Sequence, residues 1–388
     1  RPAAPQPIPA QAPKGMYRGV LVLDEAKRVE LPFTFSLVYN RRKPTITIHN
    51  ADERIVASEI RVKGDSMHFR MPVFDTEFRT RITTNGLEGI WINHYRNNQR
   101  IIPFRATHGD TRRFTNEAAV SANVEGRWQC TFSPGTSNSY PAVGLFHHIE
   151  QTAHISGTFL TETGDYRYLE GVLSHDTLLL SAFDGSHAFL FTAIVRDDSI
   201  ADGIFYSGSH WQEPWEGFRN PRYKLRDADS ITTVRDTSYP MAFAFRNSRG
   251  KTVSLSDRRY RNKPVIVQVM GSWCPNCMDE SRYLAELYER HNRAGLEIVA
   301  LAFEKTTNEK KAMSQIRRMK ERLRLPYEVL LSGAKGKDAA SKTLPGLSGI
   351  TALSNATGTM TVGRPTDGDT AERDRVVAWV RGGDNKDN

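Results

Sequence analysis

Two cysteines three positions apart, Cys274 and Cys277, are the residues of this chain best suited to chemistry. An apolar run at 265–270 precedes them, as expected of a buried β-strand. The segment after them has the period of an amphipathic helix, and Gly295 marks its expected end. Backbone N–H groups at a helix N-terminus stabilise a thiolate, and two sulfurs one turn apart can close and reopen a disulfide. The spacing therefore predicts a dithiol redox centre.

Two other interpretations of a Cys-x-x-Cys pair are less well supported. A zinc site needs two more ligands, but the chain has one other cysteine, Cys130, and no His-x-x-x-His cluster follows the pair. A purely structural disulfide is disfavoured because closing so short a loop stabilises the fold little. Cys130 alternates with aromatic residues in 128–132, which predicts a buried, inert thiol. We expect neither a metal nor a cofactor.

Composition is ordinary for a globular protein of two or three domains. Of 388 residues, 39% are hydrophobic and 25% are charged. No apolar run approaches the ~18 residues that a membrane-spanning helix needs. The net charge of +9 raises the question of nucleic-acid binding, but the arginines are scattered and form no basic block interleaved with aromatics. We therefore expect no nucleic-acid partner.

The N-terminal residues 1–15 are rich in proline and begin at arginine instead of methionine. Such a stretch favours an extended, polyproline-like arm. We expect a tether of the kind left when a targeting segment is removed, with a membrane attachment at this end.

Between residues 16 and 225, short alternating or apolar runs are broken by Gly, Asn and Asp. This pattern is typical of an all-β sandwich or barrel. The region also resembles itself: Phe74-Asp75 returns as Phe183-Asp184, and 183 − 74 = 109. The repeat predicts β units at 16–115 and 120–225, either as two small barrels or as two halves of one. Residues 226–240 lack a period and are predicted to be a linker.

From 241 to 388 the pattern changes to an α/β alternation. A hairpin around 247–250 is followed by the strand before the thiols, the thiol helix and a strand at 297–303. A second helix has its apolar face at Ala312, Ile316 and Met319, and a strand at 327–331 follows it. This order predicts a mostly parallel sheet with covered faces.

The motif Trp273-Cys274-Pro275-Asn276-Cys277 and its surroundings resemble the TlpA/ResA branch of thioredoxin-like proteins. The similarity extends over about 100 residues, from the hairpin at 253–257 to the strand ending in Glu304. The resemblance implies an exported, often membrane-tethered thiol–disulfide oxidoreductase. The β region resembles the extra N-terminal domain that some exported relatives carry.

Carried over residue by residue, the resemblance makes Cys274 the exposed, attacking thiol and Cys277 the deeper, resolving thiol. Trp273, Pro275 and Asn276 would support them. It also implies that Glu304 is a partly buried carboxylate that passes a proton to or from Cys277; a surface glutamate at a strand end is the alternative. Gln268 stands where thioredoxin has a buried acid. Because an amide occupies this position, the proton cannot be transferred by that route.

The C-terminal part from about 354 departs from the family. The family has a cis-proline followed by threonine opposite the cysteines, whereas Ser354-Asn355 stands at that place. The polar segment 354–359 predicts that the next strand is missing, and 376–380 suggests a closing helix. One hypothesis is that the last 35 residues come from a shifted reading frame (388 − 353 = 35), which would leave the sheet short of its edge.

The sequence therefore predicts an oxidoreductase of the periplasm or cell envelope that reduces protein disulfides. Its expected partners are a disulfide-bonded protein substrate and a membrane thiol reductant. Two alternatives stay open. The chain could be a binding protein whose β region recognises a partner and whose thioredoxin-like domain is impaired. A thiol peroxidase is disfavoured because it needs a Thr-x-x-Cys motif, and Ser272-Trp273 precedes Cys274 instead.

Overall fold

The computed structural model describes residues 11–98, 100–115, 122–149, 152–227, 233–234, 242–333, 343–344, 347–348, 358–362 and 377–380. The chain divides into two compact units. The first comprises residues 1–159 and 166–224, and the second comprises residues 160–165 and 225–388. Among the described residues, no helix is long and apolar enough to cross a membrane.

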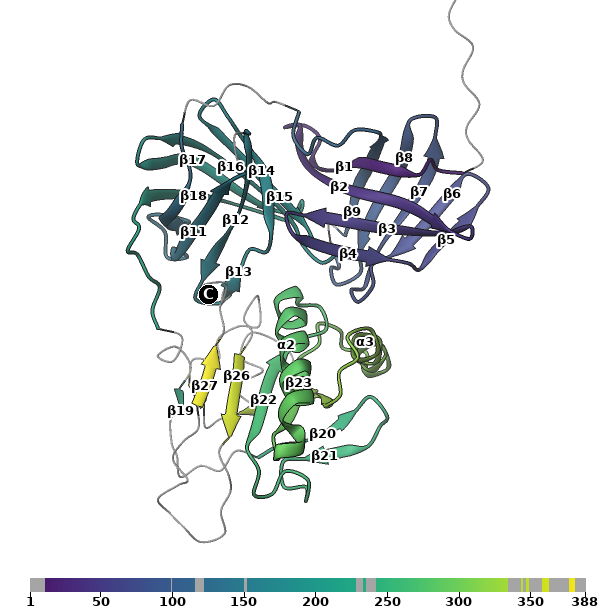
Figure 1. Ribbon diagram of the computed structural model, residues 1–388, viewed down its shortest axis with the longest axis vertical. Coiled ribbons are helices and arrows are strands. Elements are labelled where there is room, and N and C mark those ends of the chain that lie inside the picture. Colours follow the sequence, from purple (N-terminus) through teal and green to yellow (C-terminus); the bar gives the residue numbers. More distant parts are fainter. Residues whose placement is uncertain are drawn as a thin grey trace, which may run out of the picture. The chain divides into compact units, whose positions relative to one another are not determined.

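The first β sheet has nine antiparallel strands in the order β4-β3-β2-β1-β9-β8-β7-β6-β5 (Figure 1). Alternating burial along the strands turns one face of the sheet to an aromatic core, as the period of two predicts. The strands are β1 (Gly15–Asp24), β2 (Val29–Asn40), β3 (Lys43–Asn50), β4 (Glu53–Ala57), β5 (Ile60–Lys63), β6 (Ser66–Arg70), β7 (Thr76–Thr83), β8 (Gly86–Asn93) and β9 (Ile101–His108).

The second β sheet also has nine strands, and an additional pairing of β11 with β12 closes it into a barrel. Its interior is filled by aromatic side chains, among them Phe132, Phe159 and Trp215. Cys130 belongs to this core and is fully buried, as predicted. The strands are β10 (Gly126–Phe132), β11 (Tyr140–His148), β12 (His154–Thr161), β13 (Gly164–Asp165), β14 (Leu169–Ser174), β15 (Thr177–Phe183), β16 (Ala188–Arg196), β17 (Ser199–Ser207) and β18 (Trp211–Arg219).

The two β sheets are separate, and buried contacts join them within the first unit. The Phe183 ring packs against Phe33 in a tilted arrangement at a centroid distance of 4.7 Å, and its backbone exchanges hydrogen bonds with the Asn50 side chain. The buried Arg113 reaches Ser181 and Glu170 at 3.1 Å each. The duplication suggested by the 109-residue offset stays a prediction, and most of the predicted linker lies outside the described residues.

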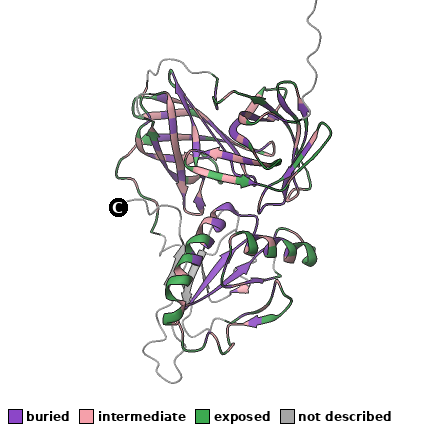
Figure 2. Ribbon diagram, turned by 45° about the vertical axis from the view of Figure 1, so that its right-hand side comes forward, coloured by how far each residue is buried: buried purple, intermediate pink, exposed green. Residues whose placement is uncertain are grey.

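The C-terminal domain has a seven-stranded sheet in the order β21-β20-β24-β23-β22-β26-β27. Strands β22, β23 and β24 are parallel, and the remaining pairings are antiparallel. Helix α2 runs along the sheet over β22 and β23 (Figure 1), and the strands of the sheet centre are buried (Figure 2). The elements are β20 (Ala244–Asn247), β21 (Thr252–Ser254), β22 (Val265–Met270), α2 (Pro275–His291), a 3-10 turn (Asn292–Ala294), β23 (Glu297–Ala302), α3 (Glu309–Arg322), β24 (Glu328–Leu331), β26 (Gly358–Val362) and β27 (Val377–Val380), and a separate two-stranded sheet pairs β19 (Thr233–Val234) with β25 (Leu347–Ser348).

Two predictions about the C-terminal part are wrong. Strand β26 pairs antiparallel with β22, from Val265 opposite Val362 to Val269 opposite Gly358, so the sheet is not short of its edge. Residues 377–380 form strand β27 and not a helix. Backbone hydrogen bonding to a central strand explains how so polar a segment is accommodated. The shifted-frame hypothesis thereby loses the observation on which it rested; residues 354–357, including the expected proline position, lie outside the described residues.

Candidate active site

The two cysteines lie at the junction of the central strand and helix α2. All six residues of β22 are buried, and Cys274 is the N-cap of α2, with Pro275 in the first turn. Proline suits this position because its fixed φ matches the helix and its missing N–H is not needed there. The Cys274 sulfur accepts the N–H of Cys277 at 3.3 Å. The strand therefore delivers one thiol to the helix N-terminus and places the second one turn later, as predicted.

The two thiols differ less in their exposed surface than the resemblance implied. The prediction that Cys274 is exposed is wrong: it retains 3% of its surface, and Cys277 retains none. All residues from Gly271 to Pro275 are buried with it, so the whole turn is packed and not only the thiol. Burial also raises the pKa of Cys277 well above its ordinary value, and the neighbouring Cys274 and the charge of Glu280 act in the same direction.

Trp273 is fixed by the strand beside the thiols. Its indole Nε1 donates to the carbonyl oxygen of Phe303 at 2.9 Å, and the Lys305 ammonium lies 3.9 Å from the ring centroid. Gly271 makes this packing feasible, since a Cβ at that position would lie 2.3 Å from the indole nitrogen. Asn276, the next predicted supporting residue, is half-buried in the first turn of α2.

Glu304 follows β23 and is buried, which contradicts the alternative of a surface glutamate. Its two carboxylate oxygens accept the N–H of Ser272 at 2.8 Å and the Ser272 hydroxyl at 2.7 Å. Burial raises the pKa of Glu304 to about 7 in spite of these two bonds. A cavity of about 500 Å³ with Glu304 in its wall extends toward α3. The carboxylate thus clamps the residue two positions before Cys274 and can exchange a proton near neutral pH.

Gln268 lies apart from Glu304 and bonds to Glu280, a residue that the sequence did not lead us to predict as part of the site. Its amide donates to a carboxylate oxygen of Glu280 at 2.9 Å and to the Ser281 hydroxyl at 3.1 Å. The Tyr327 hydroxyl donates to the Gln268 carbonyl at 3.4 Å. Glu280 is the carboxylate whose charge acts on Cys277. The signal was present in the sequence, because residues 277 and 280 are three apart and so share a helix face.

The part of the chain that carries this site is similar to known proteins. Residues 238–341 match the model of the AhpC/TSA family. Peroxiredoxin Q of Suaeda salsa is 28% identical over 104 residues, which are 26% of this chain and 44% of that protein. The thiol-disulfide oxidoreductase ResA of Bacillus subtilis is 36% identical over 59 residues, 15% of this chain and 32% of that protein. The chain therefore spans less than half the length of these relatives.

Part of this chain also aligns with solved structures. A thiol-disulfide oxidoreductase from Bacteroides fragilis aligns with 36% of this chain and 89% of its own, at 11% identity and a TM-score of 0.28. A DsbE thiol:disulfide interchange protein from Chlorobium tepidum, itself described as putative, aligns with 36% of this chain and 80% of its own, at 16% identity and a TM-score of 0.26. The family match and the ResA similarity confirm, for the C-terminal part of this chain, the thioredoxin-like resemblance predicted from the motif at Cys274.

Proposed function

We propose that this chain is an exported protein-disulfide reductase of the periplasm or cell envelope that acts by dithiol–disulfide exchange. The observation that carries the proposal is the hydrogen bond from the Cys277 N–H to the Cys274 sulfur at the start of α2. A backbone donor and the positive end of the helix dipole stabilise negative charge on Cys274. Burial opposes negative charge on Cys277. The two thiols are therefore suited to different steps.

In the first step the Cys274 thiolate attacks one sulfur of a substrate disulfide. The substrate S–S bond breaks, a mixed disulfide with Cys274 forms, and the other substrate sulfur leaves as a thiolate. In the second step Cys277 loses its proton and attacks the Cys274 sulfur. The mixed disulfide breaks, the second substrate thiol is released, and the Cys274–Cys277 disulfide remains. Two electrons have passed to the substrate.

The second step needs a proton acceptor, and Glu280 suits this role best. It lies on the Cys277 face of α2, its charge acts on that thiol, and the Gln268 amide holds its carboxylate in place. Glu304 was predicted to carry this proton. Its carboxylate instead bonds to Ser272 on the Cys274 side, so we assign it to positioning the turn that presents Cys274. Proton exchange by Glu304 stays a prediction.

A turnover leaves the pair oxidised, so a second partner must supply two electrons. By the resemblance, a membrane thiol reductant supplies them and a disulfide-bonded protein consumes them. The membrane attachment predicted for the N-terminal arm falls mostly outside the described residues.

The test is reduction of a protein disulfide by the full chain. Pre-reduced protein is mixed with insulin, and the loss of protein thiols and the gain of insulin thiols are followed together. We expect one disulfide reduced per chain, no turnover in Cys274→Ser, and unchanged turnover in the matched control Cys130→Ser. A partner retained by Cys274→Ser with no reduction by the unaltered chain would favour the binding-protein alternative.

Peroxide reduction is a second candidate because the family match and the similarity to peroxiredoxin Q favour it. In that reaction the Cys274 thiolate takes one oxygen from hydrogen peroxide, releasing hydroxide and becoming a sulfenic acid; Cys277 then displaces water to form the disulfide. Against this candidate, the hydroxyl of Ser272, which precedes the cysteine in place of the peroxidase motif, donates to Glu304 and is not free for a peroxide. Consumption of hydrogen peroxide faster than reduction of insulin would decide for the peroxidase.

A further inference from the structure

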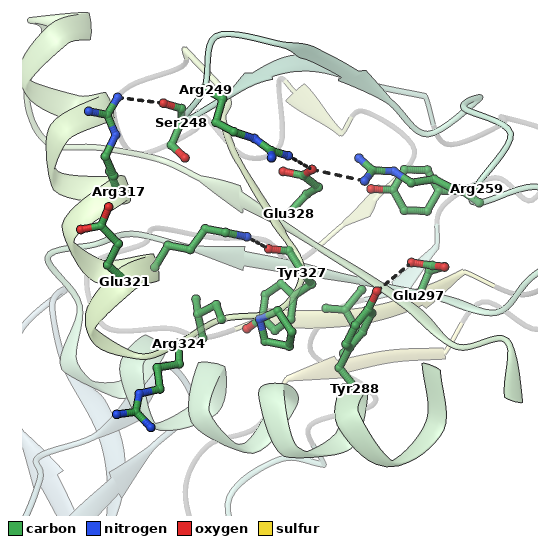
Figure 3. A pocket seen from close by; sticks show the side chains of 15 residues that line it. Ser248, Arg249, Arg259, Tyr288, Glu297, Arg317, Glu321, Arg324, Tyr327 and Glu328 are labelled. Carbon is green, nitrogen blue, oxygen red and sulfur yellow. Dashed lines mark hydrogen bonds and ion pairs between the residues drawn. The ribbon is translucent and has the colours of Figure 1, made fainter. Parts of the chain in front are cut away.

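A cavity of about 610 Å³ lies in the thioredoxin-like domain, and Figure 3 shows the side chains that line it. Glu297 and Glu328, the first residues of β23 and β24, line it. Glu297 pairs with Val265 at the start of β22, whereas Cys274 follows the end of that strand. The six residues of β22 therefore separate the cavity from Cys274, and each residue of a strand adds about 3.3 Å of length. The cavity is thus distinct from the redox centre, and its size is typical of small-molecule sites, about 300–1,000 Å³.

The charges around this cavity are predominantly positive. Five cationic side chains and three carboxylates line it, which leaves a formal charge of +2 (5 − 3 = 2). The cationic residues are Arg249, Arg259, Arg317, Lys320 and Arg324, and the acidic residues are Glu297, Glu321 and Glu328. Glu297 is in addition neutralised by Lys263, which lies outside the lining, at 2.7 Å. The lining therefore favours a ligand with two negative charges.

Glu328 fixes two of the arginines. It accepts from Arg249 at 3.3 Å and from Arg259 at 3.2 Å, as the dashed lines in Figure 3 show. Burial lowers the pKa of Lys320, Glu328 opposes this effect, and Arg249 and Arg259 act in the same direction as burial, so the three cations and Glu328 act on one space. Lys320 donates to the backbone carbonyl of Tyr327, and no ion pair of Lys320 is found among the described residues. An anion in the cavity would add to the one negative charge, that of Glu328, that acts on Lys320.

An unsatisfied hydroxyl group provides a second, independent observation. Tyr260 is 2% exposed and lines the cavity. Within the described part of the chain its hydroxyl has no hydrogen-bond partner, although buried polar groups are nearly always paired. The Arg259 guanidinium lies 4.7 Å from the centre of its ring. A buried donor beside a guanidinium is suited to an oxygen of a bound anion.

We propose that this cavity binds a small phosphomonoester, whose phosphoryl oxygens contact Lys320, Arg259 and the Tyr260 hydroxyl. A phosphate dianion matches the formal charge of the lining and the fork geometry of guanidinium groups. The cavity is larger than a phosphate ion, and Tyr288, Leu325 and Pro326 add an apolar wall for the organic part. The site does not depend on the reductase activity.

The probe is phenyl phosphate, titrated by calorimetry into the full chain at fixed ionic strength. We expect saturable binding, and binding of benzoate, which has the ring and a single charge, at least about 10-fold weaker. Lys320→Gln should weaken phenyl phosphate by about 10-fold or more. The matched control Lys310→Gln removes the same charge from an exposed position of α3 and should change the affinity less than about twofold.

Tyr260→Phe should still fold, since it removes only a hydroxyl that has no partner among the described residues. We expect its melting temperature to be equal or higher and its affinity for phenyl phosphate to fall several-fold. No saturable binding, equal weakening by Lys310→Gln, or unchanged affinity in Tyr260→Phe would overturn the proposal. Vesicles containing phosphatidate present the same group on a lipid, so comparing them with phenyl phosphate shows whether a lipid or a soluble ester is the better source.

Discussion

The side-chain amide of Gln268 donates a 2.9 Å hydrogen bond to the carboxylate of Glu280, which joins the central strand to the helix that carries both thiols. A buried amide thus takes the strand position at which thioredoxin has a buried acid, and the helix supplies a carboxylate beside it. This relationship gives the resolving thiol a proton acceptor that is held from two elements.

Replacing Glu280 by glutamine should slow the resolving step. Loss of a positioned proton acceptor reduces such steps by about 10²-fold or more. At the same time the pKa of Cys277 should fall, because a charge that raises it is removed. Quenched-flow trapping of the mixed disulfide measures the first effect and thiol alkylation against pH the second. Glu286→Gln, exposed on the same helix, is the control; equal resolution rates in both variants would refute the role.

Glu304 should make the stability of the thioredoxin-like domain depend on pH. Its pKa is about 7 in the folded state against an ordinary 4.5, so the folded protein keeps a proton that the unfolded chain releases. Its stabilising contribution is therefore complete below about pH 4.5 and is lost as the pH rises through 7. The decrease in unfolding free energy is expected to be on the order of 3–4 kcal/mol, since a tenfold change in an acid dissociation constant corresponds to about 1.4 kcal/mol.

Urea unfolding of the unaltered chain and of Glu304→Gln at pH 5 and pH 8 measures this contribution. The glutamine variant should lack the decrease between the two pH values, whereas Glu309→Gln, exposed at the start of α3, should retain it. An unchanged decrease in Glu304→Gln would show that other groups titrate in this range.

Arg113 should be essential to the β region. Arg113 is 3% exposed, and its guanidinium donates to Ser181 and Glu170. Arg113→Ala leaves a carboxylate and several acceptors without their buried donor, so we expect a loss of about 3–5 kcal/mol in unfolding free energy. Arg112→Ala, its exposed neighbour, should lose less than about 1 kcal/mol. Thermal unfolding followed by near-UV circular dichroism distinguishes the two; similar melting temperatures would contradict the assignment.

Gly271→Ala should disturb the redox centre through Trp273. The new methyl group would lie 2.3 Å from the indole nitrogen, so the Trp273–Phe303 hydrogen bond must break or the turn must move. Overpacking of this kind destabilises by about 1–3 kcal/mol. We expect lower stability and a lower rate of insulin reduction, and a variant with unchanged activity would show that the position of Trp273 is not needed.

The sequence predicted the parts of the fold whose signals are local. The apolar run before Cys274, the proline after it and Gly295 in a left-handed conformation at the end of the 3-10 turn each have a direct structural counterpart. Strand β26 was missed because its stability comes from pairing with β22 and not from its own polar composition. Glu280 was missed because its role depends on Gln268, which reaches it from another element. The burial of Cys274 likewise depends on packing that no short motif records.

The measurement that tests the central claim most directly is the redox equilibrium of Cys274 and Cys277 in glutathione buffers, read by alkylation and intact mass. The account predicts a reversible two-electron couple at or below roughly −230 mV, which is lost in Cys274→Ser. A couple near −120 mV would mark an oxidant, and the absence of any reversible change would contradict a redox function for this domain.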